Sequence, residues 1–151
     1  MSFHMSAAMD ALYRHIKTNS TTGKPDAIEV YYYCLMIGMS HGKLDSGDNI
    51  KQQEFIKDFT SSFKSVKNEI IAALISTEIK RTGQMFTSEN ILNTFKKYVD
   101  LESSTRLNPD GEKLLDRYAE GGFKILNDFN PQIVEKMDLI RYSKMLSDNI
   151  D

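Results

Sequence analysis

The chain has 151 residues, of which 40% are hydrophobic and 26% charged, and its formal net charge is −2. This length suits one domain with its own core, and the composition excludes a disordered chain and a fibrous repeat. The longest apolar run, from Val30 to Met39, is too short to cross a bilayer. Because the single cysteine, Cys34, lies inside that run, we expect an inert buried thiol and a cytoplasmic protein without a membrane segment.

The first helix is predicted from about residue 6 to residue 17, because apolar residues recur there every three or four positions. These residues are Met9, Leu12, Tyr13 and Ile16. Residues 1–5 precede the pattern, and we expect them to be disordered or vector-derived. The chain from residue 1 to residue 151 is predicted to form a single helical domain.

The second segment, residues 27–39, is apolar almost throughout. Asp26 followed three residues later by Glu29 is typical of a capping box, which predicts a helix that ends near His41, before Gly42. The many β-branched and aromatic residues also favour a strand, so this alternative stays open. A helix that is apolar nearly all round is typical of a central position in a domain.

The same segment predicts an interface with another protein. Successive helical residues lie about 100° apart, so three consecutive tyrosines cannot share one face of the helix. Tyrosine is enriched at interfaces and methionine adapts to varied contacts. We therefore expect Tyr31, Tyr32, Tyr33 and Met36 to contact a partner while another side of the helix packs inward.

Residues 50–81 carry apolar residues at alternating steps of three and four. This pattern predicts one long helix, or two helices with a break near Ser61, Ser62 and Ser65. Thr87 is a good N-cap for the next helix.

Two further helices are predicted at Asn108–Pro109 and at Asn130–Pro131, since proline at the first helical position loses no needed hydrogen bond. The second of them should run from Pro131 to about Leu146. Gly121 and Gly122 lie inside the first of these two helices and predict either a kink or the close approach of a neighbour. The expected fold class is therefore all-α, a single-domain bundle of about six or seven helices.

No catalytic, cofactor or metal template fits the sequence. The acidic loop that starts at Asp45 resembles the opening of a calcium loop, but Ile50 and Ile56 stand where that loop needs glycine and glutamate. The histidines lack partners at the spacing of a zinc site, and no nucleophile elbow, phosphate loop or dinucleotide fingerprint occurs. We therefore expect no cofactor and no metal, and the sequence leans against an enzyme.

A helix-turn-helix-like order predicts contact with nucleic acid as an alternative. Helices over about residues 66–82 and 88–99 flank a turn at Gly83, and the second helix would offer polar side chains to bases and lysines to phosphates. The candidate contacts are Lys80, Arg81, Asn90, Asn93, Lys96 and Lys97. Adjacent helices at this spacing are also common in proteins that bind no nucleic acid.

Two functions follow from these patterns. We expect a non-catalytic protein-protein interaction or assembly module, an accessory subunit of a larger prokaryotic complex that contacts a protein partner or a second copy of itself. The alternative is a nucleic-acid-binding protein within a DNA-modification or phage-defence system. A contiguous apolar surface would favour the first function, and a continuous basic face would favour the second.

Overall fold

The computed structural model describes residues 2–148 as helices joined by loops. The helices are α1 (Ala7–Asn19), α2 (Ala27–His41), the 3-10 helix η1 (Lys64–Val66), α3 (Lys67–Arg81), α4 (Ser88–Tyr98), α5 (Pro109–Phe129) and α6 (Lys136–Asp148). Within the described residues, β-type pairing is limited to three isolated bridges. The predicted all-α fold is confirmed.

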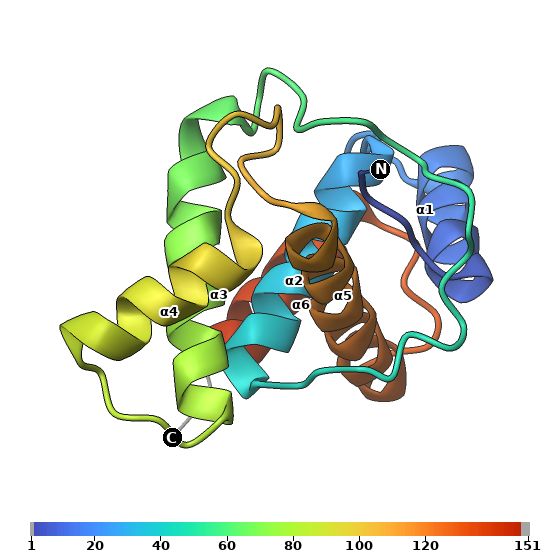
Figure 1. The fold of residues 1–151 in the computed structure, drawn as a ribbon. Coiled ribbons are helices and arrows are strands. Elements are labelled where there is room, and N and C mark those ends of the chain that lie inside the picture. The colour runs from blue at the N-terminus through green and yellow to red at the C-terminus, as the bar shows by residue number, and fades with distance from the viewer. Residues whose placement is uncertain (1, 149–151) are drawn as a thin grey trace.

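Helix α2 lies in the middle of the molecule, with α5 and α6 packed along it, α1 on one side, and α3 and α4 on the other (Figure 1). The predicted capping box of Asp26 and Glu29 is present, and Gly42 ends the helix in the left-handed conformation. Tyr31, Cys34 and other residues from around the circumference of α2 are buried. The second segment is therefore a helix, as expected of a run that is apolar on almost every side.

Helices α2 and α5 touch through their backbones at a pair of glycines. A Cβ atom added to Gly38 would lie 1.8 Å from the carbonyl oxygen of Tyr118, and one added to Gly122 would lie 1.7 Å from that of Cys34. No side chain fits at either position unless the helices move apart. Of the two roles predicted for the glycines inside α5, the close approach of a neighbour is the one observed.

Residues 50–63 are not helical, which corrects the prediction of a helix from residue 50. They lie beside the N-terminal segment, where the N–H of Phe3 donates to the carbonyl of Ile56 at 3.1 Å and the N–H of Phe55 donates to Phe3 at 3.0 Å. Lys51 donates its N–H to the carbonyl of Met5 in the same way. The apolar side chains of this stretch still pack against the core, from a backbone of bends and turns.

Residues 2–6 are buried, whereas residues 1–5 were expected to be disordered or vector-derived; residue 1 itself lies outside the described residues. The side chain of Phe3 is 0% exposed, and its ring lies 5.4 Å from the ring of Tyr31 and 5.0 Å from that of Phe59. These partners are distant in the sequence, so no local pattern marks the segment as part of the core.

Helix α6 begins at Lys136, five residues later than the predicted start at Pro131. Its first N–H groups are capped from the loop after α1, because the hydroxyl of Ser20 accepts from Lys136 and that of Thr22 accepts from Met137. In return, the Glu135 carboxylate accepts from the N–H groups of Thr21 and Thr22. The cap thus comes from another part of the chain rather than from Asn130.

We expect Gly122→Ala to destabilise the protein by more than about 3 kcal/mol, because the new methyl group would lie 1.7 Å from the carbonyl oxygen of Cys34 and would force the helices apart. The measurement is urea unfolding followed by circular dichroism. Gly83→Ala is the matched control, since a Cβ there meets nothing within 4 Å and only the left-handed backbone is strained. Equal losses of stability in the two variants would contradict the close contact.

Candidate functional site

Helix α4 presents its polar side to the protein interior. Thr87 caps its start by accepting from the N–H of Asn90 at 3.1 Å, as predicted. The residues that face inward are Thr94 and Tyr98, which are buried, and Asn90, which is half-buried. Phe95 is half-buried and packs against the core, whereas Leu92 lies on the side of the helix opposite Thr94 and is exposed.

A buried carboxylate, that of Glu78 on α3, faces the inward side of α4. This carboxylate accepts hydrogen bonds from Tyr118 at 2.5 Å, from Arg81 at 2.6 Å and, more weakly, from Tyr98 of α4 at 3.5 Å. Burial alone would raise the pKa of Glu78, but the Arg81 and Tyr118 donors bring this pKa below its usual value. An ionised group at this place favours polar atoms on the side of α4 that faces it.

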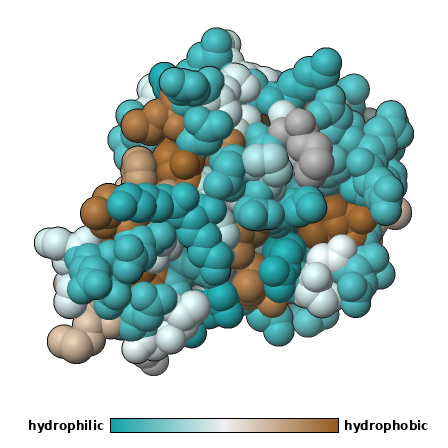
Figure 2. Space-filling model, in the orientation of Figure 1, coloured by the Kyte–Doolittle hydropathy of each residue, from teal (hydrophilic) through white to brown (hydrophobic). Residues whose placement is uncertain are grey.

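Apolar side chains are exposed around α4. Five of the seven large apolar side chains that are exposed within residues 2–148 are Met85, Phe86, Ile91, Leu92 and Leu101. We call these five residues the α4 surface. Met85 is 75% exposed and Leu92 is 50% exposed. In Figure 2, brown and tan apolar atoms reach the left edge of the molecule, where Figure 1 places α4 and the loop before it.

Two opposite charges stand at the ends of the exposed stripe of α4. Glu89 lies three residues before Leu92 and Lys96 lies four residues after it, so all three side chains share one face of the helix. Both charged residues are exposed. The stripe is therefore acidic at its start, apolar in the middle and basic at its end.

The interface residues predicted on α2 are mostly covered. Tyr31 is 0% exposed and donates its hydroxyl to Asp116 at 2.7 Å, so this side chain belongs to the core. Tyr32, Tyr33 and Met36 are half-buried and pack against the core. An interface through these residues stays a prediction, and the larger exposed apolar area lies on the α4 surface.

The helix pair predicted for nucleic acid is present as α3 and α4. Lys80, Asn93, Lys96 and Lys97 are exposed, whereas Asn90 is half-buried and donates its side-chain amide to the carbonyl of Met85. Arg81 is exposed in part, but its guanidinium is paired with Glu78. The outward stripe of α4 is centred on Leu92, which is apolar. The centre of this face therefore offers no hydrogen-bonding group to the edges of bases. Nucleic-acid binding stays a prediction.

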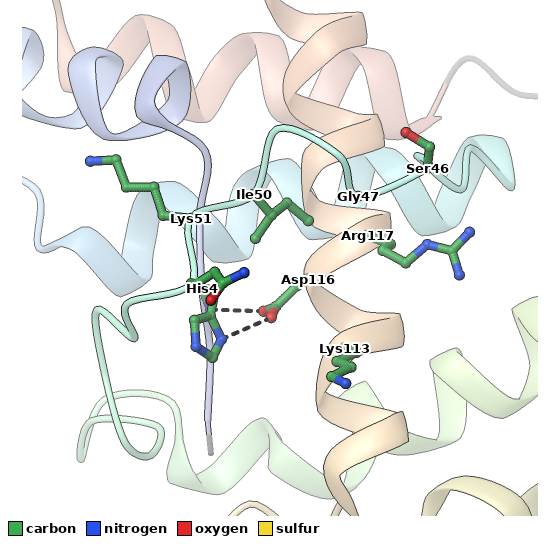
Figure 3. Close-up of a pocket in the computed structure, with 9 residues that line it drawn as sticks. His4, Ser46, Gly47, Ile50, Lys51, Lys113, Asp116 and Arg117 are labelled. Carbon is green, nitrogen blue, oxygen red and sulfur yellow. Dashed lines mark hydrogen bonds and ion pairs between the residues drawn. The ribbon is translucent and has the colours of Figure 1, made fainter.

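A pocket of about 490 Å³ lies between α5 and the loop after α2, and its floor is a buried polar network (Figure 3). The Asp116 carboxyl accepts from the Tyr31 hydroxyl at 2.7 Å and from the His4 N–H at 3.0 Å, while the His4 ring Nδ1 lies 3.3 Å away. Burial raises the pKa of Asp116 well above its usual value. Sequence reasoning missed this site, because His4 lies in a segment with no local pattern.

Two of the three cationic side chains that line this pocket, Lys51 and Arg117, are engaged elsewhere. In Figure 3, Lys51 and Arg117 extend away from His4 in opposite directions. The Lys51 ammonium lies 3.6 Å from the Asp10 carboxylate, and Arg117 donates its Nε to the Asp45 carbonyl at 2.7 Å. The pocket therefore holds an internally satisfied network that fastens the N-terminal segment to α5.

Within residues 2–148, no group of three or more His, Cys, Asp or Glu side chains is arranged to hold a metal ion. No helix in the same residues combines the length and apolar character that a bilayer span needs. Comparison of the chain with protein-family models, with curated proteins and with solved structures finds no match. The functional argument therefore rests on the geometry of the chain itself.

We expect Asp116→Asn to flatten the pH dependence of stability. An aspartate in the unfolded chain ionises at pH ~3.9, whereas burial raises the pKa of Asp116 in the folded protein, so the folded protein holds this proton to a higher pH. The stability that Asp116 contributes is therefore complete below pH ~3.9 and is lost as pH rises toward the folded pKa, by up to about 1.4 kcal/mol per pH unit. Urea unfolding between about pH 4 and pH 7 checks this.

Glu135→Gln is a control that should change the pH dependence of stability in the opposite direction. Hydrogen bonds from the backbone of Thr21 and the side chain of Thr22 lower the pKa of Glu135, so its stabilising contribution is lost as pH falls. Relative to the wild type, this variant should therefore lose less stability on acidification. A parallel pH profile for the wild type and Asp116→Asn would contradict the raised pKa of the buried carboxyl.

Proposed function

We propose that this chain is a cytoplasmic, non-catalytic helical module that binds another protein through the α4 surface, as an accessory subunit of a larger prokaryotic complex. The observation that carries the proposal is the clustering of exposed large apolar side chains between Met85 and Leu101. Contiguous exposed apolar patches mark interaction sites, whereas single exposed residues are ordinary.

The chemistry of the α4 surface favours a protein partner. Burying a fully exposed large apolar side chain contributes about 1.5–3 kcal/mol, and these five side chains are 43–75% exposed, so their burial would supply part of the free energy of association. The helical stripe of Ile91, Leu92 and the half-buried Phe95 fits the helix-in-groove or helix-on-helix mode of recognition.

Two other partners fit less well. A membrane-surface helix carries basic residues over its polar side, whereas α4 carries Glu89 beside its lysines. Nucleic acid is the second candidate, favoured by the exposed Lys80, Lys96 and Lys97 on the α3–α4 pair. Binding to the phosphate backbone would weaken steeply with salt, whereas binding through apolar contacts would not.

The interaction is tested by placing a photo-crosslinking amino acid at Leu92 in the full chain, expressed in the cells that naturally produce it. Met137 on α6 is the matched control position, because it is 53% exposed and Leu92 is 50% exposed. We expect a discrete protein adduct from position 92 and none from position 137. Equal labelling at the two positions would remove the support for a specific surface.

We further expect Leu92→Asp to abolish the association while changing the free energy of unfolding by no more than about 0.5 kcal/mol, because the side chain is exposed in the isolated chain. Loss of the crosslinked adduct from a probe at Ile91 reports the association, and urea unfolding reports the stability. A large loss of stability would instead assign Leu92 to the fold.

A further inference from the structure

The charges on the exposed face of α4 are arranged about Leu92. The midpoint between Glu89 and Lys96 falls between Leu92 and Asn93, and the side chains at those two ends carry opposite charges. An arrangement of this kind is complementary to a reversed copy of itself.

We propose that the partner of the α4 surface is a second copy of this chain, with the two α4 helices antiparallel about a twofold axis near Leu92. Glu89 of each copy then lies against the partner's Lys96. This inference rests on the proposed function, and it adds the identity of the partner and the orientation of the contact.

The charges favour the antiparallel orientation over the parallel one. Within residues 2–148, neither Glu89 nor Lys96 takes part in an ion pair, so both are available. In a parallel pair, Glu89 would face the partner's Glu89 and Lys96 would face the partner's Lys96, and both contacts repel. Antiparallel helices also bring the positive end of each helix dipole beside the negative end of the other.

The apolar side chains and the charges have separate roles in this contact. Leu92 at the axis meets its own copy, and Ile91 lies beside it on the same exposed side of α4. Burial of these side chains supplies the affinity, and the two reciprocal ion pairs set the register. Because the same patch serves both subunits, the contact closes as a dimer and leaves no open end for a filament.

The remaining exposed apolar residues do not offer an equivalent surface. Phe129 packs edge-on against Tyr142, with ring centroids 5.2 Å apart, and Met137 stands on α6. Neither residue has a large exposed apolar neighbour within one helical turn in the sequence. The α4 surface is therefore the place in the described residues where a second copy gains most by binding.

The test is a reciprocal charge exchange in the full chain, with solution mass measured by sedimentation equilibrium. Glu89→Lys and Lys96→Glu each place two like-charge contacts in a homodimer, and we expect each variant alone to dissociate at least tenfold more readily than the wild type. An equimolar mixture of the two variants should regain the wild-type dimer, because both contacts then attract. The double variant E89K/K96E should regain it alone.

Controls separate pairing from folding. Lys144→Glu changes an exposed lysine on α6 and should leave the dimer unchanged. Restoration on mixing cannot arise from a misfolded variant, and thermal unfolding by circular dichroism checks each single variant. The inference is overturned if the wild type stays monomeric at high concentration, or if mixing the two variants restores nothing.

The outcomes also distinguish this inference from the proposed function. If the probe at Leu92 crosslinks to a different protein and the charge exchanges have no effect, the second-copy inference fails while the α4 surface remains an interface. If the probe at Leu92 labels nothing above the Met137 control and Leu92→Asp does not change the association, the proposed function and the second-copy inference both fail. A crosslinked adduct that contains two copies of this chain, lost in each single variant and restored on mixing, supports both.

Discussion

The backbone contact between α2 and α5 is the constraint on which the other elements depend. Gly38 and Gly122 let the two helix axes approach until carbonyl oxygens and Cα atoms touch, and the apolar circumference of α2 is then covered by its neighbours. Gly121 extends the same principle, since a Cβ there would lie 2.0 Å from the carbonyl of Lys43 and would push away the loop after α2. Close packing at a few positions thus sets the spacing of the whole core.

This close packing leaves polar groups of α5 inside the molecule, and each recruits a partner from a distant segment. Asp116 holds the N-terminal segment through His4, and Tyr118 reaches Glu78 on α3. Glu78 in turn lies 3.5 Å from the Tyr98 hydroxyl of the neighbouring helix α4. The ionised carboxylate therefore favours a polar atom on the side of α4 that faces it.

Local signals in the sequence predicted most of the helices and their ends. The capping box at Asp26, the N-cap at Thr87 and the Asn108–Pro109 start all act within a few residues, so they can be recognised without the fold. The non-helical course of residues 50–63 could not be recognised, because this stretch pairs with residues 3–6. The late start of α6 likewise depends on the loop after α1.

The candidate site was predicted less well, for a related reason. Periodicity shows that Ile91, Leu92 and Phe95 share a side of a helix, but it does not show whether that side is inside or outside. The three tyrosines of α2 look like an interface because of their composition, whereas the exposure of each depends on α5, α6 and residues 55–63. Tyr32, for example, packs on the ring of Phe63 at 4.9 Å.

Because the helices are synthesised in order, the apolar surface of α2 is made well before the helix that covers it. The end of α2 at His41 leaves the ribosome roughly 90 residues before Phe129 completes α5, which is the helix that covers it most extensively. At synthesis rates of roughly 5–20 residues per second, α2 waits on the order of 5–20 s with its apolar surface uncovered. The nascent chain therefore passes through a stage that a chaperone can bind, and the arrival of the Gly122 segment ends that stage.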